Sequence, residues 1–264
     1  MQHLHFTQQG FGKKVLVLIH GFCEDNTIWQ HLMPTLAKHY KVIAPDLGGF
    51  GNSAHLLPQD VTVEDLAEQV KNLLDELAVK ECIMIGHSLG GYVALAYAEK
   101  YAKTLKGLGL FHSSALPDTE AKKRNRNQTT FFIQKNGVNP FADDFSAMMF
   151  FTPRHAELAK EIEYIKNSVK KTPEKSILQI TIALRDRPDR TELLKKLDFP
   201  VLFIIGREDN SIPLSAYAEQ VFYPQDSHIH ILNDTGHVGM LERPQETLDM
   251  LVHFCRRCWK EITE

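Results

Sequence analysis

Gly86-His87-Ser88-Leu89-Gly90-Gly91 is the stretch that decides the fold of this chain. It follows an apolar run at 82–85 and leads into a segment at 91–98 with helical periodicity. A serine between two glycines at a strand-to-helix junction is typical of a nucleophile elbow, a sharp turn that presents the serine hydroxyl above a sheet. The turn strains the serine backbone, so only small residues are tolerated on either side. The N-terminus of the following helix places N–H groups and a positive dipole near the hydroxyl.

Length, composition and charge limit what the protein can be. The chain has 264 residues and is 43% hydrophobic, which is enough for one sizeable core. Its formal net charge of -3 gives no electrostatic reason to expect nucleic acid or an anionic membrane as a partner. Residues 1–8 have neither the basic nor the apolar region of a secretory signal, and no apolar run approaches the roughly 18 residues of a spanning helix. We therefore expect a cytoplasmic protein without membrane insertion; its oligomeric state is not predicted.

The four cysteines predict neither disulfides nor a metal site. Four are too few for a disulfide framework in a chain of this length. Cys255 and Cys258 form a C-x-x-C pattern, but no second cysteine pair or histidine pair is near enough in sequence to complete a zinc site. We interpret both as ordinary residues of the last helix, and Cys82 as a small buried strand residue.

Short apolar runs with the length and spacing of buried parallel strands recur along the chain, at 15–19, 40–44, 82–85, 105–111, 201–205 and 228–232. Segments with helical periodicity lie between them, at 29–36, 66–77 and 248–255 among others. This alternation predicts an α/β fold with a mostly parallel central sheet, flanking helices and right-handed crossovers. Residues 3–6 are a candidate antiparallel edge strand, joined to the next strand by a turn at 10–12.

The alternation stops between residues 116 and 190, where the pattern is typical of helices and loops. We therefore expect a core domain from residues 1–115 and 191–264, with 116–190 as a helical insertion. A basic run at 122–127 is interpreted as a solvated helix face. Many large apolar residues follow at 131–151, and they either wall a pocket over the strand ends or form a small core within the insertion.

Candidate partners for the serine follow two later strands. A serine hydroxyl is a weak nucleophile that needs a base within hydrogen-bond reach, and a carboxylate orients that base. In open α/β sheets such groups lie past the carboxyl ends of strands. Asp209 follows the strand predicted at 201–205, and His237 follows the strand predicted at 228–232. The order Ser88, Asp209, His237 is the one expected with a nucleophile elbow.

Two other carboxylates compete for the role of the acid. Glu208 lies one residue closer to its strand than Asp209, and Asp118 follows the preceding strand. The end of that preceding strand, at 111–114, offers no carboxylate, which favours Asp209. Cys23 is close enough to the same edge to be considered a nucleophile, but no base is placed to activate it.

Acyl transfer also requires N–H donors for a developing oxyanion. In an elbow fold these are the backbone N–H groups of the residue after the nucleophile and of a residue in the loop after an earlier strand. Leu89 is the first donor by position. The loop at 20–23 follows the strand at 15–19, and it provides Phe22 as the second donor, with Gly21 permitting close approach.

Five motifs together resemble those of the α/β-hydrolase superfamily, within its group of small, cap-bearing serine hydrolases. They are the oxyanion loop His20-Gly21-Phe22, the loop Pro45-Asp46-Leu47-Gly48-Gly49-Phe50-Gly51-Asn52-Ser53, the elbow 86–91, the acid loop Gly206-Arg207-Glu208-Asp209 with Ile212-Pro213, and the histidine loop Gly236-His237 with Glu242 and Pro244. The resemblance implies an α/β-hydrolase fold in which residues 116–190 form the helical cap. It further implies a covalent acyl-enzyme cycle without a metal or an organic cofactor. A serine in the elbow argues against the dehalogenases and epoxide hydrolases of the superfamily, which use aspartate there.

The first functional hypothesis is a carboxylic ester hydrolase for a small or medium ester, thioester or lactone. The residues expected to contact substrate are Phe22, His87, His112, Phe141, Phe145 and Met149. Similar triads in the superfamily also perform C–C hydrolysis, amide or N-terminal proline peptide hydrolysis, and a lyase step in quinone biosynthesis, so the triad does not separate these reactions. A proline peptidase needs an acidic cluster, for which Asp143-Asp144 is a candidate, although a helix start is the simpler interpretation. A ligand sensor with little turnover is the hypothesis from another class.

Overall fold

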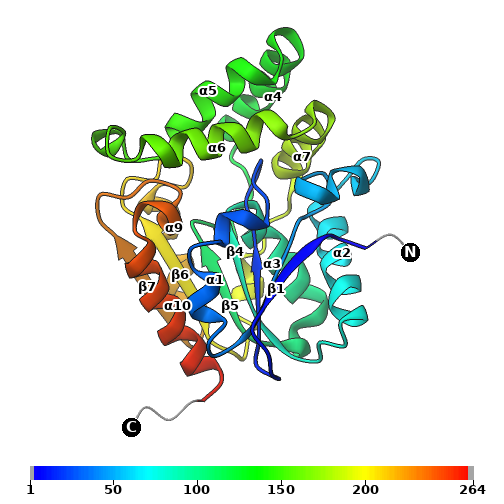
Figure 1. The fold of residues 1–264 in the computed structure, drawn as a ribbon, viewed down its shortest axis with the longest axis vertical. Coiled ribbons are helices and arrows are strands. Elements are labelled where there is room, and N and C mark those ends of the chain that lie inside the picture. Colours follow the sequence, from blue (N-terminus) through cyan, green and yellow to red (C-terminus); the bar gives the residue numbers. More distant parts are fainter. Residues whose placement is uncertain (1–2, 261–264) are drawn as a thin grey trace.

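A seven-stranded sheet runs through the centre of the computed structural model, which describes residues 3–260 (Figure 1). Its strands are β1 (Phe6–Gln9), β2 (Val15–Ile19), β3 (Lys41–Pro45), β4 (Cys82–His87), β5 (Leu105–Phe111), β6 (Val201–Gly206) and β7 (Ser227–Leu232). Across the sheet the order is β1-β3-β2-β4-β5-β6-β7. β1 runs antiparallel to β3, and the other neighbours are parallel. The predicted α/β fold with a mostly parallel sheet is therefore confirmed.

Two strands at the sheet's edges differ from the prediction in detail. The antiparallel strand begins at Phe6 rather than at His3, because the His5 N–H donates to Ser53 Oγ, 2.8 Å away, instead of joining the ladder. β7 was expected to be buried, but Ile229 is 41% exposed and Ile231 is 39% exposed. An edge strand with one open face leaves alternate side chains in solvent, so an apolar run alone does not show burial.

The helices alternate with the strands as expected. They are α1 (Met33–Leu36), α2 (Val63–Glu76), α3 (Leu89–Tyr101), α4 (Glu120–Asn136), α5 (Val138–Met148), α6 (Ala159–Lys171), α7 (Glu174–Asp186), α8 (Thr191–Leu194), α9 (Gly239–Glu242) and α10 (Pro244–Cys258). The segment at 29–36 is not one helix: a 3-10 turn at Asn26–Trp29 is followed by the short α1. Pro34 lies in the first turn of α1, where its missing N–H is tolerated, whereas a continuous helix would need that N–H.

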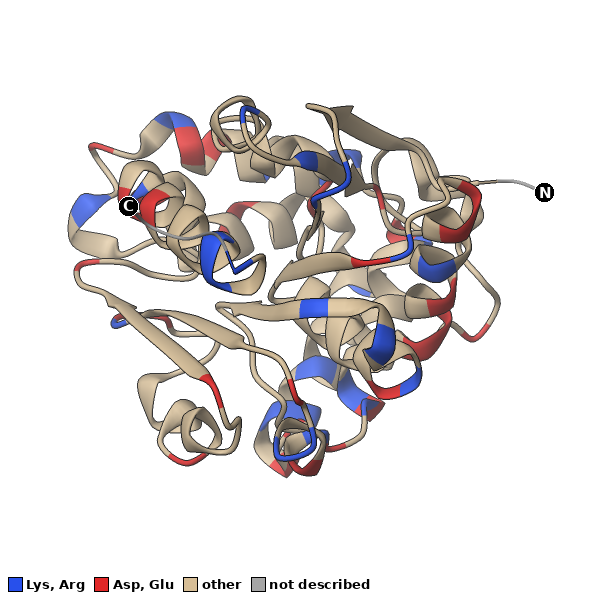
Figure 2. Ribbon diagram, turned by 90° about the horizontal axis from the view of Figure 1, so that it is seen from below, with Lys and Arg blue, Asp and Glu red and all other residues tan. Residues whose placement is uncertain are grey.

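The core is formed where helices cover both faces of the sheet. Figure 1 shows α2 and α3 on one side and α1 and α10 on the other. All residues of β2, β4 and β6 are buried, as expected for parallel strands covered twice. Seen along the sheet in Figure 2, charged residues lie mainly on the helices and loops around it. Cys255 and Cys258 lie buried on α10, as expected for ordinary helix residues.

The strand order creates a crevice next to strand β2. From β2 the chain passes to β3 on one side and then returns to β4 on the other side. Connections that leave neighbouring strands in opposite directions open a crevice at the carboxyl ends of those strands, which is the usual binding place in such sheets. The loop after β2 and the elbow after β4 therefore meet at this switch point.

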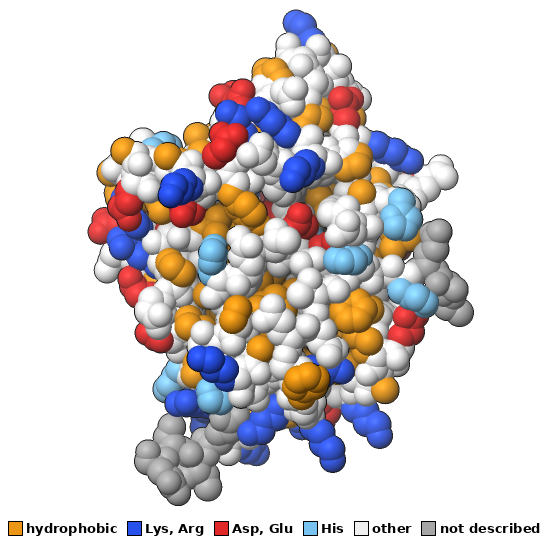
Figure 3. All heavy atoms as spheres, viewed as in Figure 1, with side chains coloured by type: hydrophobic (Ala, Val, Ile, Leu, Met, Phe, Trp, Pro, Cys, Tyr) orange, Lys and Arg blue, Asp and Glu red, His pale blue; other side chains and the backbone are white. Residues whose placement is uncertain are grey.

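Four helices, α4 to α7, lie together over the carboxyl ends of the strands (Figure 1), and we call them the helical layer. The apolar residues of these helices differ in burial: Ile133 is fully buried, whereas Phe131 is 67% exposed. Asp143 and Asp144 do not begin a helix but lie within α5, and Asp143 pairs with Lys166 across 2.9 Å. On the outside of the layer, acidic and basic side chains lie close to one another (Figure 3).

The two segments that connect the helical layer to the sheet are hydrogen-bonded to each other. Arg187 Nη1 donates to Asp118 Oδ1 at 2.7 Å, and its Nη2 donates to the carbonyl of Leu116 at 3.0 Å. The backbone N–H of Arg190 donates to the carbonyl of Ala115 at 2.9 Å. The segments that enter and leave the helical layer, at 115–118 and 187–190, are thus held together.

Among the helices of residues 3–260, none combines the length and the apolarity that crossing a bilayer requires.

Candidate active site

Ser88 is held in a strained turn between β4 and α3. Its φ is 49° and its ψ is -112°, a conformation that L residues rarely adopt. The Ser88 N–H donates to the carbonyl of Phe111 at 2.9 Å, which ties the turn to the neighbouring strand. A Cβ at Gly86 would lie 2.1 Å from the Gly90 carbonyl oxygen, and a Cβ at Gly90 would lie 2.3 Å from that of Ile19. Both glycines are therefore required by close backbone approach, as the elbow pattern predicts.

Asp209 and His237 come together at the ends of neighbouring strands. His237 Nδ1 lies 2.7 Å from Asp209 Oδ2, so Nδ1–H donates to the carboxylate and Nε2 is left as the acceptor. Asp209 Oδ1 accepts the N–H groups of Ser211 and Ile212 at 2.7 and 3.0 Å. Burial raises the pKa of Asp209, but the electrostatic interaction with His237 and hydrogen bonds from His112 and His237 outweigh it and hold that pKa well below its ordinary value. Asp209 is thus ionised, and it accepts a hydrogen bond from the ring of His237.

The rival residues have other partners. Glu208 Oε2 accepts the N–H of Thr235 at 3.0 Å and so supports the loop that carries His237. Asp118 is bound by Arg126 Nε at 2.6 Å and by Arg187. Cys23 is fully buried, and burial together with the charge of Glu24 raises the pKa of its thiol well above the ordinary value. A thiol that stays protonated is a poor nucleophile.

The loop after β2 lies beside the elbow. Leu89 is the first residue of α3, and the first N–H groups of a helix have no partner within it. On the other side, the N–H of Gly21 donates to Glu24 Oε2 at 2.7 Å, which closes the loop on which Phe22 lies. A Cβ at Gly21 would lie 2.6 Å from His87 Nδ1. The glycine therefore lets this loop approach the elbow.

Asp46, in the glycine-rich loop after β3, is a structural residue. Its Oδ1 accepts the N–H of Asn26 at 2.8 Å, and its Oδ2 accepts the N–H of Asn52 at 2.9 Å. Asp46 is fully buried. The loop is thus fixed to the segment that follows the β2 loop, which agrees with its interpretation as a structural turn near the site.

A buried ion pair between His87 and Glu24 was not foreseen. His87 Nδ1–H donates to Glu24 Oε2 at 2.9 Å, and Nε2–H donates to the carbonyl of His237 at 2.8 Å. Burial lowers the pKa of His87, but the charge and hydrogen bond of Glu24 outweigh it and raise that pKa. Burial raises the pKa of Glu24, and the interactions with His87 outweigh it and lower that pKa. Because both ring nitrogens of His87 face acceptor oxygens, its side chain joins the β2 loop, the elbow and the histidine loop.

His112 was expected to contact substrate, and the structure corrects this. It is fully buried, and the N–H groups of Gly206 and Gly239 lie 3.1 Å from its Nδ1 and Nε2. Its Nδ1 also lies 3.5 Å from Asp209 Oδ2. Burial lowers its pKa to about 4, so the ring is neutral near pH 7. His112 supports the acid and histidine loops from below and does not line the cavity.

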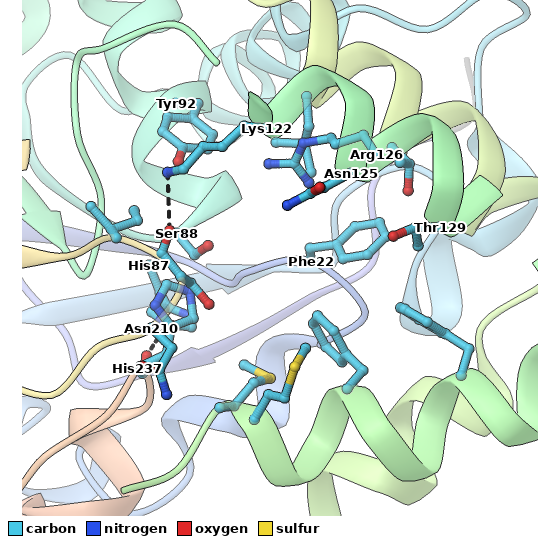
Figure 4. A pocket seen from close by; sticks show the side chains of 18 residues that line it. Phe22, His87, Ser88, Tyr92, Lys122, Asn125, Arg126, Thr129, Asn210 and His237 are labelled. Atoms are coloured by element: carbon cyan, nitrogen blue, oxygen red, sulfur yellow. Dashed lines mark hydrogen bonds between the residues drawn. The ribbon is translucent and has the colours of Figure 1, made fainter. Parts of the chain in front are cut away.

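A cavity of about 390 Å³ opens above Ser88, within the size range of small-molecule sites (Figure 4). The residues that line it are Phe22, His87, Ser88, Tyr92, Lys122, Asn125, Arg126, Thr129, Phe141, Phe145, Met148, Met149, Thr181, Leu184, Asn210, Ser211, Ile212 and His237. Four of the residues expected from the sequence to contact substrate line this cavity: Phe22, Phe141, Phe145 and Met149. His87 borders it too, although both its ring nitrogens are engaged within the protein.

The polar lining from α4 was missed. Lys122, Asn125, Arg126 and Thr129 all line the cavity, so the basic run at 122–127 is not simply a solvated face. Their spacing of three, four and seven residues places them on one side of a helix. That spacing was visible in the sequence, but it does not show whether such a side faces solvent or a pocket.

The ligand atoms of His112, Asp209 and His237 lie within 4.8 Å of one another, which makes this the group in residues 3–260 whose geometry could hold a metal ion. Hydrogen bonds already account for this closeness: Asp209 Oδ2 receives His237 Nδ1–H, and the N–H of Gly239 points at His112 Nε2. The closeness of the three side chains is therefore explained by hydrogen bonds within the protein.

Comparison with known proteins gives concordant matches. The family model described as alpha/beta hydrolase fold matches residues 14–244. A pimeloyl-[acyl-carrier protein] methyl ester esterase of Vibrio vulnificus is 26% identical, over 95% of this chain and 97% of that protein. A 2-hydroxy-6-oxononadienedioate/2-hydroxy-6-oxononatrienedioate hydrolase of Paraburkholderia phymatum is also 26% identical, over 95% of this chain and 90% of its own length.

Among solved structures, a malate-bound thermophilic esterase from Thermogutta terrifontis superposes with a TM-score of 0.90 and is 28% identical. The match covers 97% of this chain and 93% of that one. The similarity thus includes the helical layer as well as the sheet.

Proposed function

Because the chain belongs to the alpha/beta hydrolase family, we propose that it is a serine hydrolase that cleaves a carboxylic ester, thioester or lactone through an acyl-enzyme. The observation that carries this proposal is the hydrogen bond of 2.7 Å between His237 and Asp209, at a cavity that Ser88 also lines. The esterase names of the Vibrio and Thermogutta relatives support the choice of bond.

In the proposed first step, His237 Nε2 takes the proton of the Ser88 hydroxyl as Oγ attacks the carbonyl carbon. Asp209 holds the ring in the tautomer that this requires and stabilises the imidazolium that forms. The N–H groups of Phe22 and Leu89 are proposed to bind the oxyanion, whose charge develops only during the reaction. Collapse of the tetrahedral intermediate expels the alcohol or thiol, which takes the proton from His237.

In the second half of the cycle, His237 takes a proton from water, and the resulting hydroxide adds to the acyl carbon. Collapse breaks the bond to Ser88 Oγ and releases the acid, while His237 returns the proton to the serine. In a lactone the alcohol remains attached to the acyl group. Water is the only co-reactant in either case.

We propose that residues 116–190 act as a cap that encloses the substrate. The four helices lie over the carboxyl ends of the strands, and residues 116–190 supply more than half of the residues that line the cavity. Arg187 and Asp118 join the two connections, so the layer is attached as a unit. Covering a site excludes water and strengthens electrostatic interactions inside it.

C–C bond hydrolysis is the second candidate. The Paraburkholderia relative is named as a hydrolase of 2-hydroxy-6-oxononadienedioate, and the name of this substrate contains no ester; its identity to this chain equals that of the Vibrio esterase. The same serine, acid and base would then act on a different scissile bond.

Fluorophosphonate labelling combined with a p-nitrophenyl ester series tests the proposal. We expect the wild-type protein to be labelled and to turn over at least one ester, and Ser88→Ala to lose both while melting cooperatively. Ser215→Ala, at an exposed serine outside the cavity lining, is the matched control and should behave as wild type. Labelling without ester turnover would favour the C–C candidate; absence of labelling in a folded wild-type protein would refute an activated serine.

A further inference from the structure

The cavity above Ser88 has two unlike walls. The wall from α5 and the residue after it is apolar and consists of Phe141, Phe145, Met148 and Met149. The wall from α4 is polar and basic and consists of Lys122, Asn125, Arg126 and Thr129. In Figure 4, Lys122, Asn125 and Arg126 extend from one helix toward the space over Ser88.

The basic wall carries more positive than negative charge. Arg126 Nε and Arg187 Nη1 both donate to the carboxylate of Asp118, so two guanidinium groups share one counter-ion. Lys122 adds a further positive charge, and its Nζ donates to the carbonyl of Ser211 at 3.0 Å. Of the described residues that line the cavity, none is Asp or Glu. The excess positive charge at this wall is therefore unmatched by the lining itself.

Lys122 is kept close to the reacting groups by its partner. Ser211 lies two residues after Asp209, in the loop whose N–H groups bind the Asp209 carboxylate. The ammonium group of Lys122 has three N–H donors. Within residues 3–260 it donates to the carbonyl of Ser211, which leaves donors for a ligand. Burial lowers the pKa of Lys122. The charges of Arg187 and Arg126 lower it further, whereas the carboxylates of Asp118 and Asp209 oppose this effect. An anion in the cavity would relieve the repulsion between these cations.

From these contacts we propose that the substrate is an ester or lactone that also carries a carboxylate, which Lys122 and Arg126 bind at the α4 wall while the apolar remainder lies against α5. The inference rests on the proposed serine hydrolase function and adds the substrate class. A charged hydrogen bond of this kind has a strength that corresponds to roughly ten- to hundredfold in kcat/KM. The basic wall would thus select substrates by charge, and the apolar wall would select them by length.

Matched neutral substrates test the proposal. Monomethyl esters of dicarboxylic acids are compared with the same esters bearing a terminal carboxamide in place of the carboxylate. A second pair, 3-acetoxypropanoate and 3-acetoxypropanamide, places the charge on the alcohol side. In at least one pair, the wild-type kcat/KM should favour the carboxylate by about tenfold or more. Equal rates within both pairs, or a preference for the carboxamides, would overturn the proposal.

The variant Lys122→Met removes the charge and keeps much of the side-chain volume. We expect the carboxylate-to-carboxamide ratio of kcat/KM to fall about tenfold, mostly through KM of the carboxylate. Lys123→Met is the control, because Lys123 pairs with Glu120 outside the cavity and should leave the ratio unchanged. If Lys122 only latches α4 to the Ser211 carbonyl, both rates change together and the ratio stays at its wild-type value, which would refute a role in recognition.

Failure of this inference can be told apart from failure of the proposed function. Fluorophosphonate labelling and hydrolysis of p-nitrophenyl acetate do not depend on a substrate carboxylate. If both are present and the charged esters have no advantage, the serine hydrolase stands and the substrate class is wrong. If labelling of Ser88 is absent, the proposed function itself is wrong.

Discussion

The loops at the strand ends and the helical layer above them differ in where their polar side chains form hydrogen bonds. Below the cavity, Asp209, His87 and His112 direct their polar atoms to other protein groups and are almost fully buried. Above it, Lys122 and Arg126 still present donors to the cavity. Side chains whose hydrogen bonds are all formed within the protein are rigid and hold one geometry. Side chains with donors that face the cavity can bind a ligand. We therefore propose that the lower side performs the chemistry and that the upper side selects the substrate.

The largest effect is expected on the lower side, at Asp209. Asp209→Asn should reduce kcat by about 10⁴, since in a serine protease the corresponding change leaves the histidine in the wrong tautomer. Glu208→Gln is the matched control, because Glu208 supports a backbone N–H and does not touch the ring of His237; its loss should stay within about tenfold. Steady-state kinetics on the best ester, with circular dichroism to check folding, measures both. Equal losses would mean that Asp209 is not the orienting acid.

Two ion pairs, one below the cavity and one in the helical layer, are expected to differ in how much they stabilise the folded protein. Removing one partner of a buried pair costs about 3–5 kcal/mol, so Glu24→Gln should lower the melting temperature markedly. Asp143→Asn breaks an exposed pair with Lys166 in the helical layer and should have little effect. Thermal unfolding followed by circular dichroism measures both.

The sign of the pH dependence follows from the two shifts in the Glu24–His87 pair. The pKa of Glu24 is lowered in the folded protein, so its contribution to stability is present above about pH 4.3 and is lost as the pH falls through the folded-state pKa. The pKa of His87 is raised, so its contribution is complete below about pH 6.5 and is lost as the pH rises through its folded-state pKa. The difference in unfolding free energy between wild type and Glu24→Gln should therefore be largest at about pH 4.5–6.5. A difference that does not change from pH 4 to 9 would contradict the ion pair.

Within the helical layer, Phe145 tests the role of the apolar wall. Its ring packs edge-on against Phe22 with centroids 5.9 Å apart, and it lines the cavity. Phe145→Ala should lower kcat/KM by about tenfold for the ester length that the wild type prefers, with a smaller effect on acetate. Phe131→Ala, at an exposed phenylalanine on α4, is the control. A uniform loss for all chain lengths would mean that Phe145 acts by supporting Phe22 in the oxyanion loop rather than by lining the acyl pocket.

The smallest effect concerns the pH dependence of charge selection. Lys122 has a pKa lowered from 10.5, and its preference for a carboxylate requires the protonated form. The carboxylate-to-carboxamide ratio of kcat/KM should therefore fall several-fold as the pH rises through that pKa, and should do so below the pH at which a surface lysine titrates. Profiles of the ratio up to pH 10 measure this. In Lys122→Met the ratio should not vary over that range.

The elbow and the strands could be predicted because backbone geometry constrains their residues. Gly86 and Gly90 each face a carbonyl oxygen at a distance that no Cβ tolerates, so the pattern is visible in the sequence itself. Asp209 and His237 could be named because parallel strands end at the same edge, which brings residues far apart in the chain close together. His112 was misplaced by the same argument: it follows a strand end, yet its positive φ of 44° and its backbone partners hold it below the cavity.

Sequence alone therefore determined the sheet, the elbow and the order of Ser88, Asp209 and His237, since each depends on local backbone limits or on strand order. Only the tertiary structure decided that Glu24 pairs with His87 and that Lys122 and Arg126 face the cavity. These contacts join segments through side chains whose direction depends on how loops and helices dock, and no local periodicity carries that information. Periodicity showed that α4 has a basic side; the packing of the helical layer decided what that side faces.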